Sequence, residues 1–378
     1  FKGQWFHTGS WPHEGVDFSG KRVGLIGTGS TGVQATPVIA ETADHLTVFQ
    51  RTPNYSVPAH NKPLKPEFQQ WTKSNFPEIR DTMKATPAGH PFFVDDRLAV
   101  ETPADEREQL LEKAWQIGGM QFRAVFKDLM LDVNANKIVA DFVTRKIRET
   151  VKDPETAAKL TNFDHHYSTK RPIIDSHYFE AFNRDNVSLV DVKAAPIESI
   201  TPDGIRTADG AEHKLDIIIF ATGYDGVTGP LLRMNVQGRD GVSLNDVWAE
   251  GPQTYLGLQV EGFPNLFTIT GPQSPSVLTN MPVAIEQHAE WIADAIAHMR
   301  AKGAVKIEPQ SHVMGEWGEK VQAAANATLL ITAKSSWYLG ANVPGKPRAF
   351  LAWAGGMAQY RDICNTVAAN GYEGFAFA

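Results

Sequence analysis

Cysteine is almost absent from this sequence: Cys364 is the only one among 378 residues. A single thiol excludes an internal disulfide and is typical of a reducing compartment, so we expect a cytoplasmic protein. Long apolar runs are missing as well, because no segment approaches the ~18 consecutive apolar residues that a membrane-spanning helix needs. The sequence therefore predicts neither a disulfide-stabilised nor a membrane-spanning protein.

Positive charge is also in short supply. Lys and Arg number 36 against 43 Asp and Glu, which leaves a formal net charge of −7. That balance argues against nucleic acid and anionic membranes as partners, because both attract basic surfaces. We expect a small molecule as the partner instead. The length and an apolar content of 42% allow two or three domains with a sizeable core.

Three glycines near the start stand between an apolar run and a helical pattern. Residues 23–26 have the composition of a buried strand, and Gly27, Gly29 and Gly32 follow at G-x-G-x-x-G spacing. The first glycine of this motif makes a tight turn, the second lets a pyrophosphate approach the backbone, and the third lets helix pack on strand. The phosphates then lie over unpaired N–H groups at the helix N-terminus. A glycine-rich loop is the alternative, but the flanking strand and helix favour a dinucleotide site. The expected contacts are Gly27, Thr28, Gly29, Ser30, Thr31, Gly32 and Gln34.

The next strand, expected over residues 46–50, ends in Arg51 and Thr52. An enzyme that uses NAD usually has an acidic residue here to bind the ribose hydroxyls. A guanidinium and a hydroxyl suit the 2′-phosphate of NADP(H) instead. The alternative is an arginine on a solvated loop, and we favour NADP(H).

Helical patterns dominate residues 58–170 after an initial proline-rich stretch. Apolar residues recur at helical spacing over 105–117 and 138–151, and Pro154 opens a further helix at the position where proline is tolerated. More than one hundred residues with little strand signal inside an α/β chain predict a helical insertion.

Strand patterns return in the second half of the chain, over 187–191, 197–201, 215–220 and 263–270. The third of these ends in the small-residue turn Ala221, Thr222 and Gly223. Such a turn lets the backbone pass close to a cofactor, although an ordinary strand-end turn is equally compatible. A long amphipathic helix is expected over 283–301.

The opening residues FKGQWFHTGSWPH fit a longer and more specific pattern, F-x-G-x-x-x-H-x-x-x-W-P-(H/D). Its fixed positions are Phe1, Gly3, His7, Trp11, Pro12 and His13. The pattern resembles the fingerprint of the flavin-dependent Baeyer–Villiger monooxygenases. The likeness continues over essentially the whole chain, through GTGSTGVQ, VFQRTPNY, TKRP, IIFATGYD, GFPNLF and SSWYLGANVPGKP.

The resemblance implies an enzyme with FAD that uses NADPH and O₂ to insert oxygen next to a ketone carbonyl, through a C4a-peroxyflavin, giving an ester or lactone. It also implies an α/β fold with a Rossmann-like NADP domain, a helical insertion and the C-terminal part of a two-segment FAD-binding domain. The expected segments are 1–57 and 171–222 for the NADP domain, 58–170 for the insertion and 223–378 for the FAD domain.

The resemblance also implies roles for individual residues. Arg171 matches the catalytic arginine, and an always-charged guanidinium with two parallel donors suits stabilisation of an oxygen anion. Lys170 matches a 2′-phosphate ligand, and His7 a residue that couples the domains, with a structural histidine as its alternative. Trp337 resembles a tryptophan that packs on the nicotinamide nucleotide. The loop bordering flavin and substrate is matched by Ser276, Val277, Leu278 and Met281.

One departure from the family concerns the flavin. Members carry a second glycine fingerprint, for FAD, upstream of the segment where this chain begins, and only one such fingerprint is present here. Either an N-terminal portion is missing from this sequence or the protein is a truncated product, and we expect the first. Two other functions stay open: a flavin monooxygenase that oxidises nitrogen or sulfur, and a non-catalytic NADP-binding fragment.

Overall fold

The structure, a computed structural model, describes residues 1–378, and the chain forms two compact units. The first unit consists of Phe1–Lys62, Arg97–Leu129 and Val133–Tyr224. The second consists of Pro63–Asp96, Met130–Asp132 and Asp225–Ala378. The helical segment expected over 58–170 is therefore divided between the units, and the four-part domain division stays a prediction.

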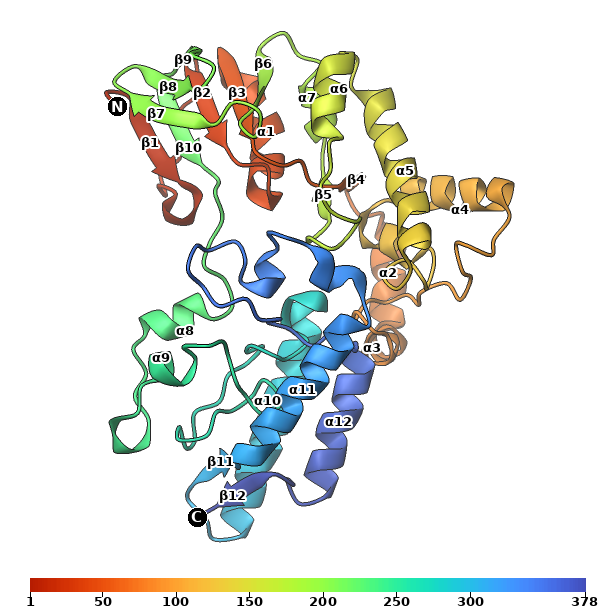
Figure 1. Cartoon of the computed structure of the whole chain (residues 1–378). Helices are drawn as coiled ribbons and strands as arrows, with labels where there is room; N and C mark the ends of the chain where they lie inside the picture. Colours follow the sequence, from red (N-terminus) through yellow and green to blue (C-terminus); the bar gives the residue numbers. More distant parts are fainter. The chain divides into compact units, whose positions relative to one another are not determined.

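A five-stranded parallel sheet forms the centre of the first unit (Figure 1). The strand order is β1-β10-β2-β3-β6, and every neighbouring pair is parallel. Its strands are β1 (Gln4–His7), β2 (Arg22–Ile26), β3 (His45–Gln50), β6 (Val187–Asp191) and β10 (Ile217–Phe220). Val23, Leu25, Leu46 and Val48 are fully buried, as expected of strands covered on both faces. Helix α1 (Ser30–Thr42) connects β2 to β3.

Four of these five strands match the sequence predictions, and β1 does not. It lies inside the fingerprint segment, and it pairs with β10 at the edge of the sheet. Its four residues, QWFH, give too short a pattern for a strand to be predicted, and tertiary pairing with β10 decides the conformation.

The first unit contains further helices and strands outside this sheet. The predicted helices are confirmed as α4 (Ala104–Ile117), α5 (Val133–Thr150) and α6 (Pro154–Leu160). Beside them lie the short helix α7 (Tyr178–Ala181) and the parallel pair β4 (Ser56–Pro58) and β5 (Ile173–Asp175). An antiparallel sheet contains β7 (Ile197–Thr201), β8 (Gly204–Thr207) and β9 (Glu212–Lys214).

The second unit is mainly helical (Figure 1). Its elements are α2 (Pro66–Ser74), α3 (Phe76–Ala85), α8 (Gly229–Arg233), α9 (Leu244–Val247), α10 (Met281–Ala301), α11 (Ser311–Asn326), α12 (Met357–Ala369) and the hairpin β11 (Ile307–Pro309) with β12 (Phe375–Phe377). The core includes a stack of Trp317 on Trp353, with ring centroids 5.0 Å apart. The long helix expected over 283–301 is confirmed as α10. No helix of the chain combines the length and the apolar character that crossing a membrane requires.

The prediction of a strand over residues 263–270 is wrong. Asn265 and Thr270 have left-handed backbone conformations, with φ of 62° and 52°, which a regular strand does not accommodate. The backbone N–H of Thr270 donates to Nδ1 of the buried His288 at 2.8 Å, and the His288 Nε2 lies 3.0 Å from the Tyr360 hydroxyl. Side chains of α10 and α12 thus fix an apolar segment that the sequence pattern could not distinguish from a strand.

Candidate dinucleotide site and apolar cavity

The glycine turn lies at the carboxyl end of β2, beside the carboxyl end of β10. Gly27 has φ 113°, and a Cβ atom on it would lie 2.4 Å from the Ala221 carbonyl oxygen. A Cβ on Gly32 would lie 2.0 Å from the Gly27 carbonyl oxygen. Both positions therefore require glycine for packing alone, the first against the turn after β10 and the second between helix and strand.

Gly29 differs from these two glycines. A Cβ on it would meet no atom within 4 Å, and its φ of −78° is open to any residue. Gly29 is the N-cap of α1, which has no side-chain cap and no acidic residue in its first turn. The first N–H groups of α1 are therefore left for an anion, and the open space at Gly29 lets that anion reach the backbone. The residues present thus fit a bound pyrophosphate.

The other predicted contacts surround this opening. Ser30 and Gln34 are exposed on α1, Thr31 is half-buried, and the buried Thr28 hydroxyl donates to the Thr52 carbonyl at 2.9 Å. This bond joins the glycine turn to the end of β3. After β10, Ala221 is buried, Thr222 is exposed and Gly223 has φ 93°. The sheet brings all of these residues to one edge, where open α/β sheets bind their ligands.

A group of cations follows the neighbouring strand ends. Arg51 follows β3 directly, and it is close enough to Lys170 to help lower the pKa of that amine, after the larger effect of burial. Lys193, two residues beyond β6, adds to the same effect. Asp164 acts on the Lys170 pKa in the opposite direction and raises it. Its carboxylate lies 3.5 Å from the Lys170 Nζ and 3.7 Å from the Lys193 Nζ. The structure thus brings the two predicted cationic ligands of the 2′-phosphate, Arg51 and Lys170, near each other and adds a third cation.

Sequence reasoning missed Lys193 and Asp164. A signal for Lys193 was available, because it follows a strand and the carboxyl ends of parallel strands meet at one edge of the sheet. The pairing of β3 with β6 was needed to use that signal, and it is a long-range contact. Asp164 lies in the loop after α6, where the local pattern gives no indication.

Arg171 is exposed at the start of the segment leading into β5. Its backbone carbonyl accepts a hydrogen bond from the Asn54 Nδ2 at 3.1 Å. Further along this segment the buried Asp175 accepts hydrogen bonds from the Ser56 hydroxyl and from the Tyr178 N–H, and burial raises the pKa of its carboxyl. A hydrogen bond to its own carbonyl and the buried polar contacts of Asp175 therefore fix the backbone at and after Arg171, whereas the Arg171 residue is exposed.

The fingerprint residues lie in and next to the edge strand β1 of the same sheet. His7 ends β1, its Nδ1 accepts the Gly9 N–H at 3.1 Å, and its ring meets Tyr224 edge-on at 5.8 Å. Trp11 packs on Phe6, with ring centroids 5.6 Å apart. Phe1 packs against a small apolar core, and the Pro12 carbonyl accepts a hydrogen bond from the Gly15 N–H. Gly3 has no room for a side chain, because a Cβ atom there would lie 2.3 Å from the Asp216 carbonyl oxygen. The contacts of His7 are those of a structural histidine that is hydrogen-bonded to the backbone, which is the alternative given above for this residue.

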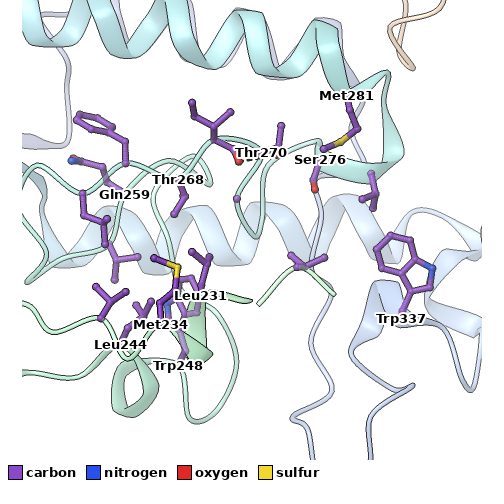
Figure 2. A pocket seen from close by; sticks show the side chains of 18 residues that line it. Leu231, Met234, Leu244, Trp248, Gln259, Thr268, Thr270, Ser276, Met281 and Trp337 are labelled. Carbon is purple, nitrogen blue, oxygen red and sulfur yellow. Dashed lines mark hydrogen bonds between the residues drawn. The ribbon is translucent and has the colours of Figure 1, made fainter. Parts of the chain in front are cut away.

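A cavity of about 440 Å³ lies within the second unit (Figure 2). Its lining is mainly apolar, with Trp337, Met281 and Ser276 at one end and Trp248 and Leu244 at the other. Val277 also lines it, whereas Leu278 packs against the core and does not reach the cavity. Ser276 has φ 42°, a strained conformation for a non-glycine residue of the kind that often marks ligand sites.

The parallel sheet, the turn and the open helix N-terminus define a dinucleotide-binding protein of the Rossmann class. No protein-family profile matches the chain. A Baeyer–Villiger monooxygenase of Pseudooceanicola batsensis is 44% identical over 98% of this chain and 68% of its own length. The acetone monooxygenase (methyl acetate-forming) of Gordonia is 42% identical over 100% of this chain and 71% of its own length. The solved complex of OTEMO with FAD and NADP is 44% identical, with a TM-score of 0.95 over 100% of this chain and 71% of that one.

The chain belongs to the Baeyer–Villiger monooxygenases. The predicted family, the α/β fold with a Rossmann-like domain, and the cofactors FAD and NADP(H) are confirmed by these relatives. The roles of the individual site residues stay predictions. So does the cytoplasmic location.

Proposed function

We propose that this chain forms the NADP(H) site and part of the ketone site of an enzyme that inserts one oxygen atom of O₂ beside a ketone carbonyl, yielding an ester or lactone. When bound, NADPH supplies the hydride and FAD supplies the oxygen-activating chemistry. The relative from Gordonia is named for forming methyl acetate, the ester that corresponds to acetone. The observation that carries the proposal is that Lys170, a member of the cation group suited to the 2′-phosphate, directly precedes Arg171 in the chain.

The first unit binds the nucleotide in this account. The N–H groups at the start of α1 bind the pyrophosphate, with Gly29 giving it access. Arg51 and Lys170 bind the 2′-phosphate, which carries about −1.5 to −2 charges at neutral pH and which NADH lacks. Lys170 lies beside Asp164, and the next residue, Arg171, has its carbonyl bound by Asn54. Binding of the nucleotide at Lys170 and the position of the Arg171 backbone are therefore linked.

Arg171 acts as the catalytic residue. The guanidinium stays charged at any physiological pH and offers two parallel donors to oxygen atoms that become negative during oxygen insertion. Trp337 and Met281 contact a cofactor, and Ser276 and Val277, which line the cavity, border the ketone. Leu278 packs against the core and does not touch the ketone. The apolar lining near Ser276 suits a bulky alkyl or aryl ketone rather than a charged one.

The test compares Arg171→Ala with Arg171→Lys and with the exposed control Arg184→Ala, in protein supplied with FAD, NADPH, O₂ and an aryl ketone. We expect Arg171→Ala to lower ester formation by roughly a hundredfold or more, a typical cost of losing one charge-stabilising donor, while NADPH is still oxidised. Unchanged ester yield would exclude Arg171 as the catalytic residue. Nitrogen or sulfur oxidation without ester would favour the related oxygenase chemistry. NADP⁺ binding by a protein that takes up no flavin would favour the non-catalytic fragment.

A further inference from the structure

Lys170, which is assigned to the 2′-phosphate, shares one carboxylate with the neighbouring Lys193. Asp164 lies 3.5 Å from the Lys170 Nζ and 3.7 Å from the Lys193 Nζ. Both distances exceed those of the tight lysine pairs elsewhere in the same unit, 2.8 Å for Lys159 with Glu155 and 2.6 Å for Lys137 with Asp141. The carboxylate therefore offsets one of the two positive charges of these amines and holds neither amine in a close pair.

The neighbouring histidine does not supply this carboxylate with a charge. Burial, and then Lys170, lowers the pKa of His165 to about 4, so the ring is neutral at pH 7. Its Nε2 lies 3.2 Å from the Asn54 Oδ1, because the Asn54 amide nitrogen is used on the Arg171 carbonyl. The neutral ring has one proton for two acceptors, the Asn54 Oδ1 and the Asp164 carboxylate, which lies 3.2 Å from Nδ1, so it offers Asp164 at most one neutral hydrogen bond and no positive charge. The lysines are the cations that compensate Asp164.

We propose that Asp164 is an internal counter-ion of the 2′-phosphate site, and that it limits how tightly and how selectively the site binds NADP(H). The inference rests on the proposed function, because Lys170 is assigned there to the 2′-phosphate. An incoming 2′-phosphate brings negative charge to Lys170 and Lys193, where Asp164 already lies. The phosphate must therefore share the amines with the carboxylate and is repelled by it. NADH meets no such competition, so Asp164 reduces the advantage of NADPH.

The experiment measures the binding of 2′,5′-ADP and 5′-AMP to this chain by calorimetry at low and moderate salt. Asp164→Asn keeps the shape of the side chain and removes its charge. We expect its Kd for 2′,5′-ADP to fall on the order of tenfold, with a stronger salt dependence, because one like charge next to the ligand is gone. The Kd for 5′-AMP should stay unchanged.

Two further variants make the result specific. Asp141→Asn is the matched control: this exposed residue of α5 changes the net charge equally, and it should leave both Kd values as in the unmodified chain. Asp164→Glu keeps the carboxylate and should retain the original Kd for 2′,5′-ADP. If Asp164→Asn does not fold, Asp164→Ser removes the same charge in a smaller side chain.

The outcomes separate this inference from the proposed function. Unchanged or weaker 2′,5′-ADP binding by Asp164→Asn would overturn the counter-ion role and would indicate that the carboxylate positions the lysines. An equal gain in Asp141→Asn would show an effect of net charge alone and would also overturn it. Equal binding of 2′,5′-ADP and 5′-AMP by the unmodified chain would instead contradict the 2′-phosphate site itself.

Discussion

The glycine turn permits a test in which fold and ligand binding are separated by neighbouring substitutions. Gly29→Ala places a methyl group in open space at the N-terminus of α1, and Gly32→Ala places one 2.0 Å from the Gly27 carbonyl oxygen. If the turn is a pyrophosphate site, the first change should affect binding and the second should affect the fold. A third change, Gly315→Ala in the middle of α11, is the control, because its Cβ meets nothing within 4 Å and it lies in the second unit.

The expected magnitudes follow from this geometry. Gly29 has φ −78° and no clashing neighbour, so its replacement by Ala should cost less than about 1 kcal/mol of unfolding free energy, chiefly as a poorer N-cap. The methyl group obstructs an approach that offers charged hydrogen bonds of about 1.5–3 kcal/mol each. Losing one of them weakens NADP⁺ binding by roughly tenfold to a hundredfold. Gly32→Ala overpacks a buried contact between helix and strand, which typically costs about 1–3 kcal/mol.

Denaturant titration and calorimetric titration with NADP⁺ give the two quantities for each variant. Gly29→Ala should unfold near the denaturant midpoint of the unmodified chain and bind NADP⁺ poorly, whereas Gly315→Ala should bind it normally. NADP⁺ binding by Gly29→Ala at full strength would refute the assignment of the pyrophosphate to this turn. Destabilisation by Gly29→Ala as large as that by Gly32→Ala would refute the distinction between the two glycines.

Two other predictions concern the cations of the 2′-phosphate site and the buried His288. Arg51→Ala or Lys170→Ala should raise the Kd of NADPH by about tenfold or more and change that of NADH little, since only NADPH has the 2′-phosphate; equal losses for both would contradict the assignment. Burial lowers the pKa of His288 to about 4 from the ordinary 6.5. The folded state then binds fewer protons than the unfolded state between these values, so the unfolding free energy should fall as the pH drops from about 6.5 to 4, by up to about 3 kcal/mol for this group. Unfolding of His288→Gln should show a shallower pH dependence, and parallel curves for the variant and the unmodified chain would contradict this role.

Much of the first unit could be predicted from the sequence because its signals are local. The apolar run at residues 23–26, the glycine spacing and the helical pattern of α1 all indicate the same βαβ unit, and the structure confirms it. The buried strand β10 was predictable for the same reason, since its residues Ile217–Phe220 form a continuous apolar run.

The errors and omissions depend on long-range contacts. The segment 263–270 has the apolar composition of a strand, but the buried His288 and the left-handed Asn265 set its path. Strand β1 exists because β10 lies beside it. Asp164 and Lys193 belong to different loops, and the fold alone brings them to Lys170. A sequence pattern identifies residue types suited to a site, whereas the partners that modify their charge come from tertiary structure.

Oxygen insertion by this protein is tested most directly by following an oxygen atom from isotopically labelled O₂ into the ester. The protein is incubated with FAD, NADPH and an aryl ketone, and the ester is analysed by mass spectrometry beside the Arg171→Ala variant. We expect one labelled oxygen atom in each ester molecule formed by the unmodified protein and almost no ester from the variant. Unlabelled ester, or equal amounts of labelled ester from both proteins, would contradict it.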